Sequence, residues 1–161
     1  MLKNVNNDAY TIKDDLIKRI AVVLIEIYTV VKEKLTPDIY DHYIFTPRDM
    51  TSILNNLSLY YIENDDDIIT ALLDEFNRSF RQRIVKRDSL ANYDSVVNRL
   101  IKNNFSFFKP NPDLVFTSLL KKGSILHKIP MTDLMQMLQN GLVSYEREYV
   151  DLGLKLHADV I

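Results

Sequence analysis

One arginine of this chain occupies a position where a positive charge is unusual. Arg48 follows Thr46 and Pro47 in the stretch HYIFTPRDM, which covers residues 42–50. Thr46 is a favourable helix N-cap, and Pro47 suits the first helical position. Asp49, three residues after the cap, can reach back to it as in a capping box. The spacing therefore predicts a helix that begins at Pro47 and carries Arg48 in its first turn.

Two interpretations of Arg48 remain open from the residues alone. The first turn of a helix favours anions, because the helix dipole places partial positive charge there. A guanidinium held at that point leads to the hypothesis that an anion binds to it. The alternative is an arginine that is simply exposed or ion-paired, which is the common situation for this residue type.

The other residues whose side chains could take part in catalysis or bind a ligand form no recognisable site. A lone histidine such as His42 is expected to be hydrogen-bonded within the fold rather than to act as a switch or a ligand. The acidic run at 64–67 lacks the alternating ligands, central glycine and distant glutamate of a calcium loop, and is interpreted as the charged start of a helix. Residues 121–124 (KKGS) form a predicted loop without the phosphate-loop pattern. We therefore expect no catalytic residue and no metal site.

Composition narrows the class of protein. The chain has 161 residues, of which 47% are hydrophobic and 26% charged, as in a single globular domain. A net charge of −2 argues against a nucleic-acid binder. The apolar run at 20–31 contains Glu26 and is too short and too charged to span a bilayer. There is no cysteine, which excludes disulfides and thiolate chemistry. No nucleic-acid partner and no membrane partner are expected.

Apolar residues recur mostly with helical spacing, so the predicted fold is mainly α with at most a short β segment near residues 113–120. The expected helices cover residues 14–35, 47–60, 66–86, 89–103 with Asp88 as its cap, and 133–149, and another starts at Asp151. The strongest break lies at 103–112, which contains Pro110 and Pro112. The apolar end, Val160 and Ile161, suggests that the chain stops within a helix and is a piece of a longer protein.

Two expectations concern how the helices pack. The apolar stripe of the first helix is widened by Ala21, Val22, Ile25 and Tyr28, which indicates that the helix is covered on more than one side. The polar face of the third helix carries Arg78, Arg81 and Arg83, which are interpreted as structural, on a solvated or salt-bridged face. Glu75, three residues before Arg78, is expected to pair with it.

Residues 43–50 resemble the "HYIFTPRD" signature of dynein heavy chains, which lies in the small domain of their third AAA+ module. The helix at 75–85 resembles the family's "E-x-x-R-x-F-x-D-R-L-V" pattern, although Gln82 replaces the family aspartate. Further segments are similar to the family at 25–28, 34–38, 132–134 and 141–148, whereas 103–128 shows little similarity. The amino-acid sequence of the last segments is most similar to that of the intraflagellar-transport (cytoplasmic type 2) dyneins.

The resemblance implies a helical AAA+ lid-type bundle at 1–103, an irregular connector with a possible strand at 104–130, and a helical segment at 131–161 that leads into the next module. In the family, the arginine at the position of Arg48 is a sensor-2-like residue that approaches the nucleotide phosphates from the lid. The parent protein would be an ATP-driven, minus-end-directed microtubule motor of the cytoplasm and cytoskeleton, and of the cilium if it is type 2. Neighbouring AAA+ modules, microtubules, and dynein light and intermediate chains would be its partners.

The fragment itself lacks a phosphate loop, so the resemblance implies no hydrolysis by this chain alone and no cofactor in it. ATP or ADP with Mg would bind in the parent motor. An alternative from another class stays open. A helical adaptor that binds a partner protein, without a nucleotide role, would explain the helices and the lack of a catalytic centre, but not the matched segments.

Overall fold

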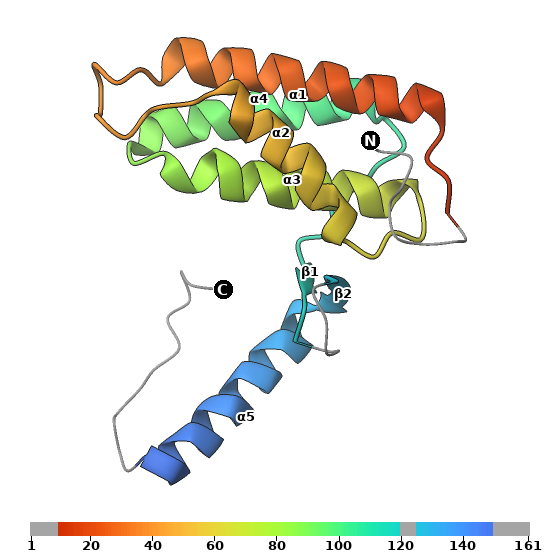
Figure 1. Cartoon of the computed structure of the whole chain (residues 1–161), viewed down its shortest axis with the longest axis vertical. Helices are drawn as coiled ribbons and strands as arrows, with labels where there is room; N and C mark the ends of the chain where they lie inside the picture. Colours follow the sequence, from red (N-terminus) through yellow and green to blue (C-terminus); the bar gives the residue numbers. More distant parts are fainter. Residues whose placement is uncertain (1–9, 120–124, 150–161) are drawn as a thin grey trace.

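The computed structural model describes residues 10–119 and 125–149, and four of its helices pack into a bundle (Figure 1). These helices are α1 (Asp14–Lys34), α2 (Pro47–Asn56), α3 (Asp65–Ser79) and α4 (Arg87–Asn104). Two short strands follow, β1 (Leu114–Thr117) and β2 (His127–Pro130), and then α5 (Met131–Tyr149) extends away from the bundle. The prediction of a mainly helical fold is confirmed.

The first helix forms where its sequence predicts. Asp14 and Asp15 lie in its first turn, and Lys32 and Lys34 lie in its last turn, where each charge complements the helix dipole. Its buried side chains follow the helical period: Leu16, Ile20, Val23, Leu24, Ile27, Tyr28 and Val31.

The expected second covered side of α1 is only partly present. Tyr28 is buried, but Val22 and Ile25 are 46% and 56% exposed. They lie on the side of the helix away from the buried stripe, and the described part of the chain leaves them exposed there.

One contiguous apolar core joins all four bundle helices. Its largest fully buried side chains are aromatic: Tyr43, Tyr60, Phe76, Phe80 and Phe105. Burying such side chains supplies the dominant favourable free energy of folding, at roughly 2–3 kcal/mol each. The bundle can therefore hold the segments between its helices, residues 36–46 and 80–86, in fixed positions.

Three predicted helix ends are wrong. The second helix changes to a 3₁₀ turn, η2 (Leu57–Leu59), and the third ends at Ser79 rather than near residue 86. Another 3₁₀ turn, η3 (Arg81–Arg83), follows it, because this segment bonds to the chain before α2 instead of continuing as a helix. Asp88 does not cap α4, whose N-cap residue is Lys86.

A second strand was missed. The segment at 114–117 is extended as predicted, but it pairs antiparallel with β2, where Val115 lies opposite Ile129 and Thr117 opposite His127. This ribbon contacts the bundle through backbone bonds, since Tyr61 N–H donates to Leu126 O at 2.9 Å and Leu126 N–H to Leu59 O at 2.7 Å. The Lys128 amino group also pairs with Asp67, which is 3% exposed. Short strands of this kind depend on such partners.

Some expectations cannot be compared with this structure. The loop at 121–124, the helix expected from Asp151 and the end of the chain within a helix lie outside the described residues. The division at 103 and 130 into lid, connector and onward segment stays a prediction. Among the described helices, none has the length and apolarity needed to cross a membrane.

Candidate functional site

The start of α2 is built by its own sequence. The backbone N–H of Thr46 donates to Oδ2 of Asp49 at 2.6 Å, and the Thr46 hydroxyl donates to the same oxygen at 3.1 Å. A capping box is present and Pro47 takes the first helical position, both as predicted. These bonds occupy donors that would otherwise have no partner at a helix start, so the first turn is held firmly.

Arg83 of η3 clamps this helix start from the other side. Its guanidinium donates to Oδ1 of Asp49 at 3.4 Å, to the carbonyl of His42 at 3.3 Å, and to the carbonyl of Ile44. The same group lies over the ring of Phe45, 4.3 Å from its centroid. A planar guanidinium can serve several acceptors and an aromatic face together, which a lysine cannot do. Arg83 is thus structural, as expected, but its role as a clamp was not foreseen.

Aromatic side chains complete the contact between the two segments. The N–H of Val85 donates to the Tyr43 hydroxyl at 3.0 Å, and Tyr43 contacts the rings of Tyr40 and His42 edge-on. Nε2 of His42 lies 3.1 Å from the carbonyl oxygen of Arg83. The prediction that His42 is hydrogen-bonded within the fold is confirmed. Residues 42–49 therefore form one unit with 83–85.

Arg48 differs from all of these residues. It is exposed, and its side chain makes no hydrogen bond, ion pair or ring contact with any residue that the structure describes. Asp49, the nearest acid in the sequence, is engaged by Thr46 and Arg83 instead. The ion-paired interpretation of Arg48 is thereby excluded within the described ranges. Its guanidinium is presented to solvent from a fixed helical turn, and its predicted contact with a nucleotide stays a prediction.

The other arginines of the third helical region have partners. Arg78 pairs with Glu75 at 3.2 Å, as predicted, and Arg81 makes two bonds to Asp94 at 2.8 and 3.0 Å. The bond from Asp94 raises the pKa of Arg81, which stays charged. The Arg78 pair lies within α3, whereas the Arg81 pair joins η3 to α4, so both arginines are engaged by acids of this fold.

Glu75 and Tyr60 form a buried polar pair. Glu75 is 1% exposed and accepts from Asn56 at 2.8 Å, while the Tyr60 hydroxyl lies 2.8 Å from Glu75 and 2.6 Å from Asp74. Burial, and then the bond to Asp74, raise the pKa of the Tyr60 hydroxyl, so it keeps its proton and acts as a donor. This network joins η2 to α3 and stabilises the fold.

Metal ligands do not gather anywhere in the described ranges 10–119 and 125–149, where no group of three or more His, Cys, Asp or Glu side chains could hold an ion. The start of α2 has one chemical capability that the structure supports. It can present one permanent positive charge, on a rigid support, to an anion that another part of a larger protein supplies.

Comparisons with known proteins show which family the chain resembles. Residues 1–90 match the family model described as the dynein heavy chain ATPase lid domain. The chain is 28% identical over 149 residues to cytoplasmic dynein 2 heavy chain 1 of Chlamydomonas reinhardtii, covering 86% of this chain and 3% of that protein. It is 25% identical over 186 residues to the Mus musculus protein of the same name, covering 99% of this chain and 4% of the relative.

A more distant relative is the dynein heavy chain-like protein 1 of Plasmodium falciparum, 25% identical over 150 residues, which cover 86% of this chain and 3% of that protein. The chain thus spans only a few per cent of the length of these relatives. The predicted resemblance to dynein heavy chains is confirmed, and so is the greater similarity to the type 2 cytoplasmic dyneins.

Proposed function

The chain belongs to the dynein heavy chain family, and from this premise we propose that it serves as the lid of a nucleotide-binding module in a longer motor chain. In that role Arg48 contacts the phosphates of a nucleotide held by neighbouring protein. The observation that carries the proposal is the exposed guanidinium of Arg48, which has no partner within 10–119 and 125–149 and lies on a firmly capped helix start. We place the lid in the third AAA+ module, because residues 43–50 resemble the signature of that module in the family.

A phosphate contact by Arg48 would be relayed through the fold. The guanidinium offers a planar fork of donors to phosphate oxygens and stays charged at any working pH. Asp49 follows it directly and ties the first turn to Arg83, which in turn holds the carbonyls of His42 and Ile44. Force on Arg48 would therefore move α2 and the clamped segments together, so that the nucleotide state sets the angle of the lid.

The nucleotide and Mg would be held mainly by other parts of the parent chain. Among the described residues, Arg48 is the cation that we propose for the phosphate contact, and no acidic cluster fits a metal ion. When bound, the nucleotide would supply the phosphate charge to which Arg48 responds. The parent motor would hydrolyse ATP, move towards microtubule minus ends and work with dynein light and intermediate chains. Its place would be the cytoplasm and cytoskeleton, and the cilium for a type 2 dynein.

The test replaces Arg48 in the full heavy chain that carries this lid. Arg48→Ala is expected to weaken nucleotide affinity at the module at least about tenfold, because a charge-assisted contact contributes roughly 1.5–3 kcal/mol. Release of a fluorescent ADP analogue measures this. Arg99→Ala is the matched control, since Arg99 is also exposed on the bundle and shows no ion pair with the described residues. Equal affinity of the two variants would contradict the proposal.

The isolated chain gives a second test. It is expected to show no ATP turnover and to bind nucleotide no more tightly than about 1 mM, which corresponds to about −4 kcal/mol. Measurable hydrolysis by the 161-residue chain would contradict the role of a lid that depends on neighbouring protein.

The second candidate, a helical adaptor without a nucleotide role, is favoured by exposed apolar side chains away from Arg48. Val143 and Tyr145 of α5 are 46% and 47% exposed, and Leu119 is 57% exposed. Leu119 and Tyr145, together with Met137 and Leu142, border an apolar groove that no described element covers. Arg48→Ala in the full heavy chain separates the two candidates, because an adaptor would keep its nucleotide affinity unchanged.

A further inference from the structure

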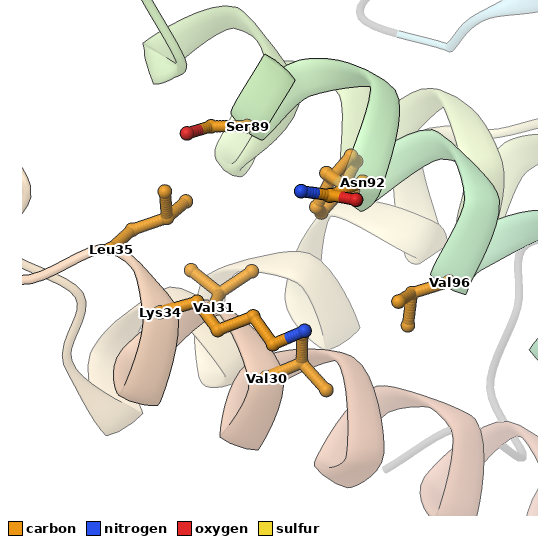
Figure 2. Close-up of a pocket in the computed structure, with 8 residues that line it drawn as sticks. Val30, Val31, Lys34, Leu35, Ser89, Asn92 and Val96 are labelled. Carbon is orange, nitrogen blue, oxygen red and sulfur yellow. The ribbon is translucent and has the colours of Figure 1, made fainter. Parts of the chain in front are cut away.

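A cavity opens between α1 and α4, away from the start of α2. It has a volume of about 140 Å³ and is lined by eight residues from the end of α1 and the start of α4 (Figure 2). Most of its lining is apolar: Val30, Val31, Leu35, Tyr93 and Val96. Arg48 does not line it, so the cavity has no part in the proposed nucleotide contact.

Three polar side chains stand at the cavity. In Figure 2, Lys34 runs along α1 so that its amino group lies beside Val30, while Ser89 and Asn92 come from α4 on the other side of the cavity. None of these three side chains makes a hydrogen bond or ion pair with another described residue. None of the lining residues is acidic, so the cavity carries one net positive charge. An apolar floor with a few convergent polar groups is the usual build of a binding site.

The size of the cavity limits what it can hold. Pockets that bind small molecules usually enclose about 300–1,000 Å³, whereas about 150 Å³ accommodates a single benzene ring. At about 140 Å³ the cavity suits one large apolar side chain rather than a cofactor. Anchor side chains that fill such pockets commonly dominate the affinity between proteins.

We propose that this cavity docks a partner protein through one phenylalanine or leucine side chain flanked by a carboxylate. The apolar side chain fills the floor between Val30 and Val96. The carboxylate accepts hydrogen bonds from the Lys34 ammonium, which has no competing acid in the lining. Asn92 and Ser89, on the opposite wall, bond to the backbone of the docked segment. Charge and volume together select an acidic, apolar segment.

The test uses the 161-residue chain with isotope-labelled methyl groups and three capped peptides. Acetyl-Asp-Phe-Asp-amide is expected to shift the methyl signals of Val30, Leu35 and Val96, with a dissociation constant of about 1 mM. Acetyl-Asn-Phe-Asn-amide should bind several-fold more weakly, because it lacks the carboxylates. Acetyl-Asp-Ala-Asp-amide should not bind, because it lacks the ring. Absence of shifts with the first peptide would overturn the proposal.

Matched variants assign the two contacts. Lys34→Gln is expected to lower affinity for the acidic peptide about fivefold, while Lys32→Gln, in the same last turn but outside the lining, leaves it unchanged. Val96→Phe should fill the cavity and abolish binding, while Val22→Phe on the exposed side of α1 should not. Circular dichroism checks that each variant keeps its helices. Equal affinity of Lys34→Gln and the unmodified chain would overturn the role of the carboxylate.

Binding of phenylacetate tests the alternative that the cavity holds a small aromatic acid instead of a side chain of a partner protein. If this small acid shifted the same methyl signals at the same concentration as the peptide, the site would be one for small aromatic acids, and the proposal of a protein partner would be overturned. A partner protein instead predicts that phenylacetate binds at least several-fold more weakly. None of these outcomes depends on Arg48, so the nucleotide proposal stands or fails separately.

Discussion

Two arginines near the start of α2 show how differently one residue type can be used. Arg83 is engaged by Asp49, two backbone carbonyls and the ring of Phe45, and its side chain is 31% exposed. Arg48, on the adjoining turn, is exposed and meets no described partner. The first arginine fixes the local structure, and the second is presented by it. A half-buried arginine with several partners thus lies next to one that has no partner among the described residues, which is the arrangement we expect if the fold holds Arg48 ready for a ligand.

The comparison is tested most severely by Arg83→Ala. It removes hydrogen bonds to two carbonyls and one carboxylate together with the contact on Phe45, so the free energy of unfolding should fall by about 2–3 kcal/mol. Urea unfolding of the 161-residue chain measures this. Arg83→Lys, which keeps the charge but loses the planar fork, should recover only part of the loss. A change below about 0.5 kcal/mol would show that the clamp is not needed for stability.

A buried polar contact far from Arg48 should give the next largest effect. Tyr60→Phe keeps the ring on Phe116 but removes the hydroxyl that contacts Asp74 and Glu75, and should lower the free energy of unfolding by about 1–2 kcal/mol.

The same contact has a pH dependence. The folded-state pKa of Tyr60 is raised above its usual 10.0, so the folded state holds this proton more tightly than the unfolded state. The stability that it contributes is therefore present below about pH 10 and decreases as pH rises beyond that value. Urea unfolding at pH 7 and above pH 10 checks this, since the difference between Tyr60→Phe and the unmodified chain should shrink at the higher pH.

Asp49→Asn separates the cap from the clamp. The amide can still accept from the N–H of Thr46 but offers no charge to Arg83, so a loss of about 1 kcal/mol is expected. A double-mutant cycle with Arg83→Ala should show a coupling energy of at least about 0.5 kcal/mol. Strictly additive effects would mean that the two side chains act independently.

The smallest effect on stability is expected from Arg48→Ala. No described contact is lost, so the free energy of unfolding should change by less than about 0.5 kcal/mol, while nucleotide affinity in the full heavy chain falls. Urea unfolding of the isolated chain provides the first measurement. Destabilisation as large as that of Arg83→Ala would make Arg48 structural and would remove the contrast between the two arginines.

Much of the fold near the candidate site follows from local sequence. Thr46, Pro47 and Asp49 predicted the start of α2, and the helical spacing of Leu16, Ile20 and similar residues predicted the buried face of α1. The end of α3 was placed wrongly, because an apolar pattern that includes Ile84 gives no sign that residues 81–85 bond to the segment before α2. β2 was missed because a short strand forms only with its partner, here residues 114–117.

The sequence by itself determined which turn carries Arg48 and how that turn is capped, because these bonds join residues within four positions and follow from backbone geometry. Only the tertiary structure decided that Arg83, 34 positions from Asp49, clamps the turn, and that Lys128, 61 positions from Asp67, pairs with it. It also decided that no described acid reaches Arg48. Contacts over such separations depend on how helices pack, which no local pattern of residue types specifies.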